Sequence, residues 1–227
     1  NIKDFKLEVK LQNPKILIKN NDIKLSKFDL YLPLKSFYTS DFILEKANLE
    51  FQQNDIKDLI KISSIFLPRF LNKKLDKIFI KGNLEGDLTV PFTQKGSISK
   101  DYKFNLRILE SNIRLNKDFE LKNFTANLTY GEKSTTERLK IKIKNGNISN
   151  LELLESFIDV SFKENYKNIK SSFHTKGKIN FLEIKKIANL LDVKLNYFDN
   201  IIVNSDLISN LNFNLSDNLK IKNINYS

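Results

Sequence analysis

Few residues in this 227-residue chain have the type and spacing that chemistry requires. The chain has one histidine and no cysteine, which excludes thiol chemistry, cysteine-ligated metal sites and a disulfide framework. His174 lies in the run Phe173-His174-Thr175-Lys176, in the polar phase of an alternating segment. We therefore interpret it as a surface side chain rather than a catalytic base or a metal ligand. No metal site is predicted.

Two other constellations have simpler structural explanations. Asp55 and Asp58 are spaced like a pair of acids, but they open a helical pattern, where an N-cap and compensation of the helix dipole account for both. Gly82 and Gly86 lack the Lys-Ser/Thr of a phosphate-binding loop and lie in a strand pattern, which favours close packing or a bulge. The sequence thus predicts no catalytic residues, no cofactor and no enzymatic activity.

The charge is strongly positive, at +11, and comes from 34 Lys and only 4 Arg. Asn occurs 29 times, so part of the Lys excess is interpreted as coding bias toward Lys, Asn and Ile. The remainder favours an anionic partner such as phospholipid headgroups or nucleic acid. The chain lacks Met and any apolar run near the ~20 residues of a membrane span, so we expect a segment of a longer protein whose anchor lies outside it.

Alternation of apolar and polar residues with a period of two dominates the chain and predicts β-strands with one apolar face. It is clearest in Phe5–Leu11, Leu84–Val90, Phe104–Ile108, Leu139–Ile143 and Leu211–Leu215. Polar turn formers separate these segments, as in 20–22, 94–97, 116–118, 131–134 and 145–147. Asn145-Gly146 is the strongest hairpin signal among them. The sequence therefore predicts an antiparallel meander.

Only two segments have helical spacing, near residues 55–67 and 183–192. We expect Ile56, Leu59 and Ile60 in the first, and Ile184 and Ile187 in the second, to dock on the sheet. The two segments align about 128 residues apart, each between two strand patterns. The whole chain, 1–227, is therefore expected to form one continuous β segment with repeat units of about 1–130 and 131–227.

The size of the sheet decides what its apolar face requires. About 14 strands at roughly 4.8 Å spacing form a sheet of about 65 Å, whereas a helix about 10 Å across covers two or three strands. The sheet must therefore fold into a sandwich, close as a barrel, or curl into a trough filled by something apolar. We expect the trough: a mainly β fold with a long, curled, open antiparallel sheet and two short edge helices.

The residues expected to line this groove are apolar side chains in one phase of the strand patterns. They are Leu84, Leu88, Val90, Phe104, Leu106, Ile108, Phe119, Leu121, Leu128, Ile141, Ile143, Val160, Phe162, Phe173, Ile179, Phe181, Leu211, Phe213 and Leu215. Such a surface needs no polar recognition site, because burial of apolar area stabilises a ligand without direction.

The sequence resembles the bacterial AsmA-like family, the relatives of TamB and YhdP. The resemblance covers nearly the whole chain and rests on 47–51, 55–59, 81–86 and 121–128, which are Ala-Asn-Leu-Glu-Phe, Asp-Ile-Lys-Asp-Leu, Lys-Gly-Asn-Leu-Glu-Gly and Leu-Lys-Asn-Phe-Thr-Ala-Asn-Leu. It implies a β-groove, anchored at the inner membrane and reaching through the periplasm of a Gram-negative bacterium, that moves phospholipids toward the outer membrane. It brings no catalytic residues.

Two other functions were weighed. A β-sandwich module that engages outer-membrane proteins through an exposed edge strand is the alternative from a different class. Nucleic-acid binding is not expected, because the Phe residues occupy the apolar phase and the Lys residues are spread along every strand instead of clustering beside aromatic platforms. An open apolar trough in the structure separates the first alternative from lipid binding.

Overall fold

The computed structural model describes residues 6–18, 21–34, 43–63, 69–99, 101–115, 117, 119–131, 138–190, 202–216 and 221–226. These residues form thirteen strands and three helices. The strands are β1 (Lys6–Gln12), β2 (Lys15–Ile18), β3 (Asn21–Pro33), β4 (Lys46–Asp55), β5 (Phe79–Pro91), β6 (Lys103–Arg114), β7 (Glu120–Tyr130), β8 (Arg138–Ile148), β9 (Leu151–Leu153), β10 (Ser156–Phe162), β11 (Tyr166–Asn180), β12 (Ile202–Ser216) and β13 (Ile221–Tyr226). The helices are α1 (Ile56–Ser63), α2 (Arg69–Ile78) and α3 (Phe181–Leu190).

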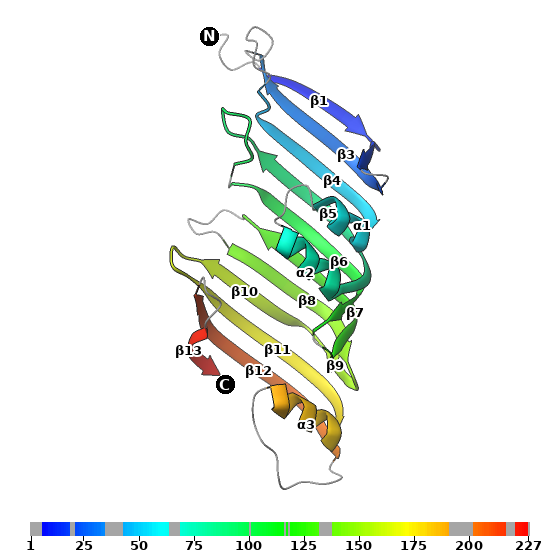
Figure 1. Cartoon of the computed structure of the whole chain (residues 1–227), viewed down its shortest axis with the longest axis vertical. Coiled ribbons are helices and arrows are strands. Elements are labelled where there is room, and N and C mark those ends of the chain that lie inside the picture. Colours follow the sequence, from blue (N-terminus) through cyan, green and yellow to red (C-terminus); the bar gives the residue numbers. More distant parts are fainter. Residues whose placement is uncertain are drawn as a thin grey trace.

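All thirteen strands belong to one antiparallel sheet whose spatial order follows the chain (Figure 1). The path runs β1-β3-β4-β5-β6-β7-β8-β10-β11-β12-β13, with the short β2 paired to β3 and the short β9 paired to β8 and β11. The predicted meander is confirmed. Its cause is the sequence pattern, since alternating strands joined by short polar turns pair most directly with their neighbours in the chain.

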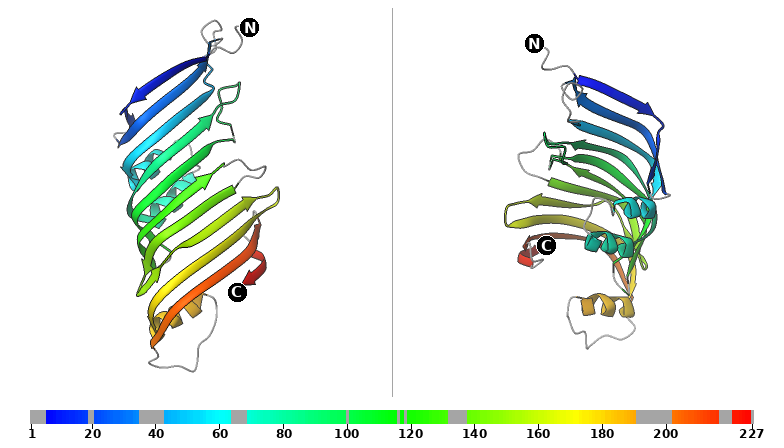
Figure 2. Two further views of the ribbon diagram at one scale, coloured as in Figure 1. Left: turned by 180° about the vertical axis from the view of Figure 1, so that it is seen from behind. Right: turned by 45° about the horizontal axis from the view of Figure 1, so that its top comes forward.

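The two faces of the sheet differ in what covers them. All three helices lie on one face, which we call the inner face, and the view from behind shows the opposite, outer face without helices (Figure 2). Pairing across the sheet places the apolar phase of the strands on the inner face, as in Leu88↔Phe104 and Ile169↔Phe213. The strands bend toward the helix-bearing side, so the sheet is curled as expected (Figure 2).

A line of β-bulges crosses the sheet and produces this bend. Register shifts interrupt five successive pairings, from β3–β4 to β7–β8. Glu110 and Asn123, at the bulges of β6 and β7, adopt positive φ angles of 47° and 51°. Bulges bend a strand and increase its local twist. Because they lie side by side on six neighbouring strands, the bends add up along one line.

Two glycines permit the close approach of strands near this line. Gly82 has a φ of 142°, and a Cβ atom there would lie 1.8 Å from the Oγ of buried Ser111. Gly86 has a φ of 128°, and its Cβ would lie 2.2 Å from the carbonyl oxygen of Asn105. Residues with a Cβ rarely adopt such φ values. The prediction of close packing or a bulge at both glycines is confirmed.

The helical segment expected over 55–67 is two helices, so the predicted number of two helices is wrong. α1 ends at Ser63, residues 64–68 lie outside the described part, and α2 follows. Leu75 of α2 packs against the buried core cluster, whereas Ile78 at the end of the helix is 38% exposed.

The start of α1 agrees with the sequence prediction. The backbone N–H of Lys57 donates to Asp55 Oδ1 over 2.7 Å, which is the bond of an N-cap. The Lys57 ammonium in turn donates to Asp76 Oδ1 over 2.9 Å and links α1 to α2.

Helix α3 begins two residues before the predicted start, and residues 191 and 192 lie outside the described part. A capping box sets this start. The N–H of Glu183 donates to Asn180 Oδ1 over 2.9 Å, while the N–H of Asn180 donates to Glu183 Oε2 over 3.1 Å. Strand, helix and strand thus recur as predicted, while the division into units near residue 130 stays a prediction.

The hairpin predicted at Asn145-Gly146 is wrong. Both residues lie inside β8, which continues to Ile148 and turns at Ser149 and Asn150. Gly146 is needed for packing, because a Cβ there would lie 2.8 Å from the side chain of Leu121. The turn predicted at 94–97 is confirmed, because the Gly96 N–H donates to the Thr93 carbonyl over 2.9 Å between β5 and β6. The turn predicted at 20–22 is wrong in its bounds, because Asn21 and Asp22 already belong to β3.

The buried core lies on the inner face, where α1 and α2 pack against the sheet. Ile56 and Ile60 belong to one buried cluster with residues of β6, β7, β8 and β9. The sheet members of this cluster are Ile108, Leu121, Phe124, Ala126, Ile143 and Leu153. Leu59 packs instead against a second cluster formed by Ile23 and Leu25 of β3. Docking of α1 on the sheet is therefore confirmed. Ile184 is half-buried, and the side chain of Ile187 lies outside the described part.

Candidate functional site

An unbroken apolar row runs across ten strands on the inner face. Each member is directly opposite the next in the strand register. The members, from β1 to β12, are Leu11, Phe28, Leu49, Leu88, Phe104, Tyr130, Leu139, Val160, Ile169 and Phe213. Paired residues lie on the same side of a sheet about 5 Å apart, so the ten side chains form one continuous surface. We call it the central row.

A second row lies beside the central row, closer to the bulges. It passes through Phe51, Gly86, Leu106, Leu128, Ile141, Ile158, Ser171 and Leu211. Most members of both rows are half-buried rather than buried, and Leu11 at the edge is 44% exposed. We call the two rows together the trough, and the described residues place no second sheet over it.

The structure places the predicted lining residues on this side of the sheet with two exceptions. Seventeen of the nineteen are strand residues in the inner phase of the register. Phe119 is buried in the connection before β7, and Phe181 begins α3. Leu84, Leu88, Val90, Phe104, Leu106, Leu128, Ile141, Val160, Phe162, Phe173, Ile179, Leu211, Phe213 and Leu215 are half-buried on the inner face.

Seven predicted lining residues belong to the buried core cluster or pack against it. Ile108, Leu121 and Ile143 are buried in the same cluster as Ile56 and Ile60 of α1, and Leu84, Leu128, Ile141 and Phe173 pack against this cluster. The sequence does not distinguish these buried positions from the open ones, because the apolar alternation of a strand is the same along its whole length. Only the position of the helices on the sheet makes the difference. The sequence prediction also missed Phe28, Leu49, Tyr130, Ile158 and Ile169 of the two rows, although each lies in an alternating segment.

Aromatic rings gather at the side of the trough away from α1. Tyr130 stacks on Tyr102 and on Phe104, with ring centroids 5.0 and 5.5 Å apart, and meets the edge of Phe162 at 6.1 Å. Offset stacking and edge contacts of this kind add to the energy of simple area burial. These rings form a wide, flat apolar wall, contributed by β6, β7, β10 and the turn before β6.

His174, the only histidine of the chain, lies on the outer face beside two charged side chains. His174 Nε2 lies 2.7 Å from Asp206 Oδ1, and the Lys176 ammonium lies 3.2 Å from Asp206 Oδ2. The hydrogen bond from His174, and then that from Lys176, lower the pKa of the Asp206 carboxyl. All three residues lie on the surface, in agreement with the sequence interpretation of His174.

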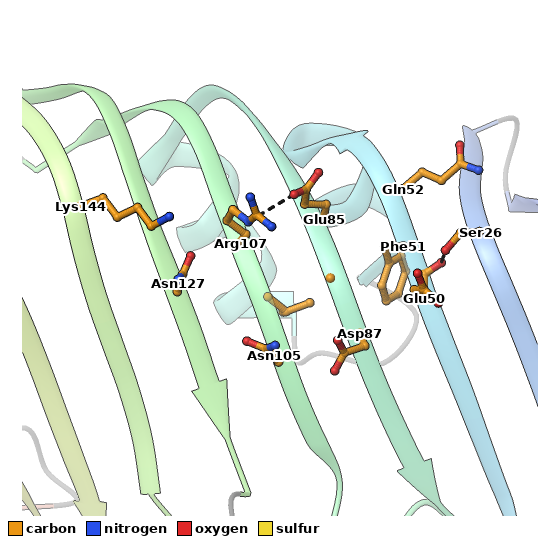
Figure 3. Close-up of a pocket in the computed structure, with 12 residues that line it drawn as sticks. Ser26, Glu50, Phe51, Gln52, Glu85, Asp87, Asn105, Arg107, Asn127 and Lys144 are labelled. Carbon is orange, nitrogen blue, oxygen red and sulfur yellow. Dashed lines mark hydrogen bonds and ion pairs between the residues drawn. The ribbon is translucent and has the colours of Figure 1, made fainter.

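The outer face is also hollowed beside the bend (Figure 3). The hollow has a volume of about 560 Å³ and is lined by polar side chains of β4, β5, β6, β7 and β8. The Arg107 guanidinium lies 3.2 Å from Glu85, while Asp87 and Lys144 line other parts of it (Figure 3). No nucleophile with an adjacent base lies here, so the arrangement offers electrostatics rather than a reaction.

Asp87→Asn is expected to raise the thermal midpoint at neutral pH. Partial burial of the Asp87 carboxyl, and then the charge of Glu50, raise its pKa. Because the pKa of this carboxyl is higher in the folded state than in the unfolded state, the protein loses stability as the pH rises through the two values. A neutral Asn side chain avoids this loss. The gain should shrink as the pH falls and vanish at about pH 2.5, more than one unit below the ordinary Asp pKa of about 3.9, where the carboxyl is protonated in both states.

Asp206→Asn is the matched control and should do the opposite. Its lowered pKa gives stability that is present at neutral pH and is lost as the pH falls through the folded-state value. Thermal melts of both variants at the two pH values test the pair. A lower midpoint for Asp87→Asn at neutral pH would contradict the assignment.

Comparison with protein-family models, with curated proteins and with solved structures finds no match. The helices of the described residues have 8 or 10 residues each, and none of them is long and apolar enough to cross a bilayer. Within the same residues, His, Asp and Glu form no group of three that could hold a metal ion. Function must therefore be argued from the trough itself.

Proposed function

We propose that this chain is a non-enzymatic, lipid-binding segment of a bridge-like protein that moves phospholipids between the inner and outer membranes of a bacterium. Acyl chains would lie in the trough, along the central row. The observation that carries this proposal is the continuity of that row through ten paired strands, with most of its side chains half-buried and, in the part of the chain that the structure describes, no second sheet over them.

The length of the row suits acyl chains. Nine strand spacings of about 4.8 Å give roughly 43 Å, whereas an acyl chain spans half of a hydrocarbon core of about 30 Å, or about 15 Å. The trough therefore exceeds the length of one acyl chain, so a lipid tail can occupy several positions along it. A ligand that moves needs such equivalent positions, and a row of aliphatic and aromatic side chains without a polar anchor supplies them.

The energetics favour a ligand of low specificity. Burial of apolar area contributes about 25 cal/mol per Å² regardless of direction, so any acyl chain is stabilised at any point of the row. The resemblance to AsmA-like proteins supports the same function and implies the setting, which is the periplasm, with an inner-membrane anchor in another part of the full protein. Polar headgroups would remain in water along the open side of the trough.

The alternative assembly module is less well supported. It requires the apolar phase of the strands to be filled by a second layer of the protein's own side chains, as in a sandwich. The described strands all belong to one sheet, and only α1 and α2 bury a substantial part of its inner face. Within the described residues, no second sheet therefore fills the trough.

The chain purified from bacterial cells is expected to carry phospholipid in more than trace amounts. An apolar face of this size binds acyl chains present in the cell, and dissociation into water is unfavourable. Native mass spectrometry of the purified protein, together with lipid extraction and chromatography, measures this. A protein that is lipid-free, stable and monomeric would contradict the proposal.

A further inference from the structure

The outer face carries a second surface, over β8, β10, β11 and β12, whose composition differs from the rest of that face. Seven basic residues lie on the outer face of these strands, against two acidic residues. The basic residues are Arg138, Lys140, Lys142, Lys144, Lys170, Lys176 and Lys178, and the acidic ones are Asp159 and Asp206; β9 and the short turns beside these strands add Glu152, Glu155, Lys163 and Glu164.

The acidic residues neutralise only part of this charge. Asp159 pairs with Arg138, and Asp206 pairs with Lys176 and His174. In the described part of the chain, Lys142, Lys144, Lys170 and Lys178 are exposed and have no carboxylate within ion-pair distance. Their positive charge is therefore available to a partner.

Large apolar side chains stand among these lysines and point to water. Phe157 is 47% exposed and lies directly between Lys142 of β8 and Ser172 of β11 in the register. Ile208 is 58% exposed on β12, opposite His174. The alternation of the strands puts both on the outer face, so neither belongs to the trough. The outer face of β4, β5 and β6 carries no exposed large apolar side chain among the described residues.

The surface is also regular. The β8–β10, β10–β11 and β11–β12 pairings run without a register shift. The pairings from β3–β4 to β7–β8, toward the other end of the strand order, are interrupted by bulges. No helix covers this part of the outer face, as the view from behind shows (Figure 2). A broad area of strand surface is therefore accessible to a partner that is itself extended and flat.

We propose that this face binds the surface of an anionic phospholipid membrane, with the lysines at the headgroups and Phe157 and Ile208 inserted between them. Lysines attract anionic headgroups within a Debye length, and exposed aromatic and aliphatic side chains gain free energy by entering the interface. Single-stranded nucleic acid fits less well. Its bases stack on rows of aromatic rings, and Ile208 has no π-face for stacking.

Sedimentation with vesicles tests this proposal on the full chain. We expect binding to be at least about tenfold tighter when phosphatidylglycerol replaces about a third of the lipid in phosphatidylcholine vesicles. Raising the salt from about 0.1 M to about 1 M shortens the screening length from about 10 Å to about 3 Å and should release the protein.

Paired variants locate the binding surface. Lys142→Glu with Lys144→Glu should reduce binding to anionic vesicles at least about tenfold, and Phe157→Ser with Ile208→Ser should reduce it severalfold. The matched controls are Lys81→Glu with Lys103→Glu, which change the same charge on β5 and β6, and Leu17→Ser, which removes an exposed apolar side chain on β2. These controls should bind as the unaltered chain does, and circular dichroism confirms that each variant is folded.

Three results would overturn the proposal. These are equal binding to neutral and anionic vesicles, no effect of the β8 charge reversals, and binding of a thymidine oligonucleotide that the Phe157 variant loses while vesicle binding is absent. The trough variant Leu106→Asp should still sediment with vesicles. Membrane binding by the outer face and lipid binding in the trough can therefore be contradicted independently of each other.

Discussion

Replacing Leu106 by Asp is expected to abolish lipid binding while leaving the protein folded. Leu106 is half-buried in the second row, between Gly86 and Leu128, and it is not part of the buried cluster that contains Ile56 and Ile60. A carboxylate there lies where acyl chains pass, and its desolvation by a lipid tail costs several kcal/mol unless water enters. In the absence of lipid the same carboxylate stays hydrated, so folding is little affected. Lipid content and thermal midpoint of one preparation measure both effects.

The neighbouring inner-face residue provides a matched control. Ile108 is two positions along the same strand, but it is buried in the core cluster that contains Ile56 and Ile60. Ile108→Asp should therefore unfold the protein, because a charge in a closed core has neither water nor a partner. Lys103→Asp, at an exposed position opposite Thr89 on the outer face of the same strand, should change neither property. If Leu106→Asp unfolds the chain, the trough is a core; if it folds and binds lipid normally, lipid binding is located elsewhere.

Truncating Ile60 to Ala is expected to lower the free energy of unfolding by about 2 to 5 kcal/mol. Ile60 is 6% exposed, and it shares a buried cluster with Ile56, Ile108 and Ile143. The neighbours are held by the sheet and cannot collapse into the space that the side chain leaves. Urea titration followed by circular dichroism measures the change.

Lys61→Ala is the control on the exposed side of the same helix. Its ion pair with Asp58, at 2.8 Å, is exposed to water and is expected to contribute almost nothing. Equally small changes at Ile60 and Lys61 would show that α1 does not dock on the sheet. A large change at Ile60 together with loss of lipid would indicate that α1 also fixes the shape of the trough.

The strand content of this fold could be predicted because the period-two pattern is a local property. Segments such as Phe104–Ile108 have one apolar side wherever they pair, so the meander and the inner phase of most lining residues followed directly. The register could not be predicted. The central row depends on which residue faces which, as in Tyr130↔Leu139, and a shift by one residue would destroy it.

The errors have a common physical origin in tertiary context. Asn145-Gly146 has the composition of a hairpin turn, yet Gly146 is used to admit the Leu121 side chain within β8. Ile108 and Leu106 have the same local pattern, yet only Ile108 belongs to the buried cluster that contains Ile56 and Ile60. The bulges at Glu110 and Asn123 were not signalled by glycine, which is the usual sequence marker for a positive φ.

The order of the strands has a consequence for how such a protein changes in evolution. Every strand of the main path bonds to its neighbours along the chain, apart from the small detours of β2 and β9, so contacts between distant parts of the sequence are few. Architectures of this kind behave as one-dimensional arrays, in which a unit interacts only with the next. Inserting or deleting one pair of strands therefore changes the span of the molecule by about 10 Å without rebuilding the rest. Selection can therefore adjust the length of the molecule in steps of one strand pair, while the stability of each local region stays the same.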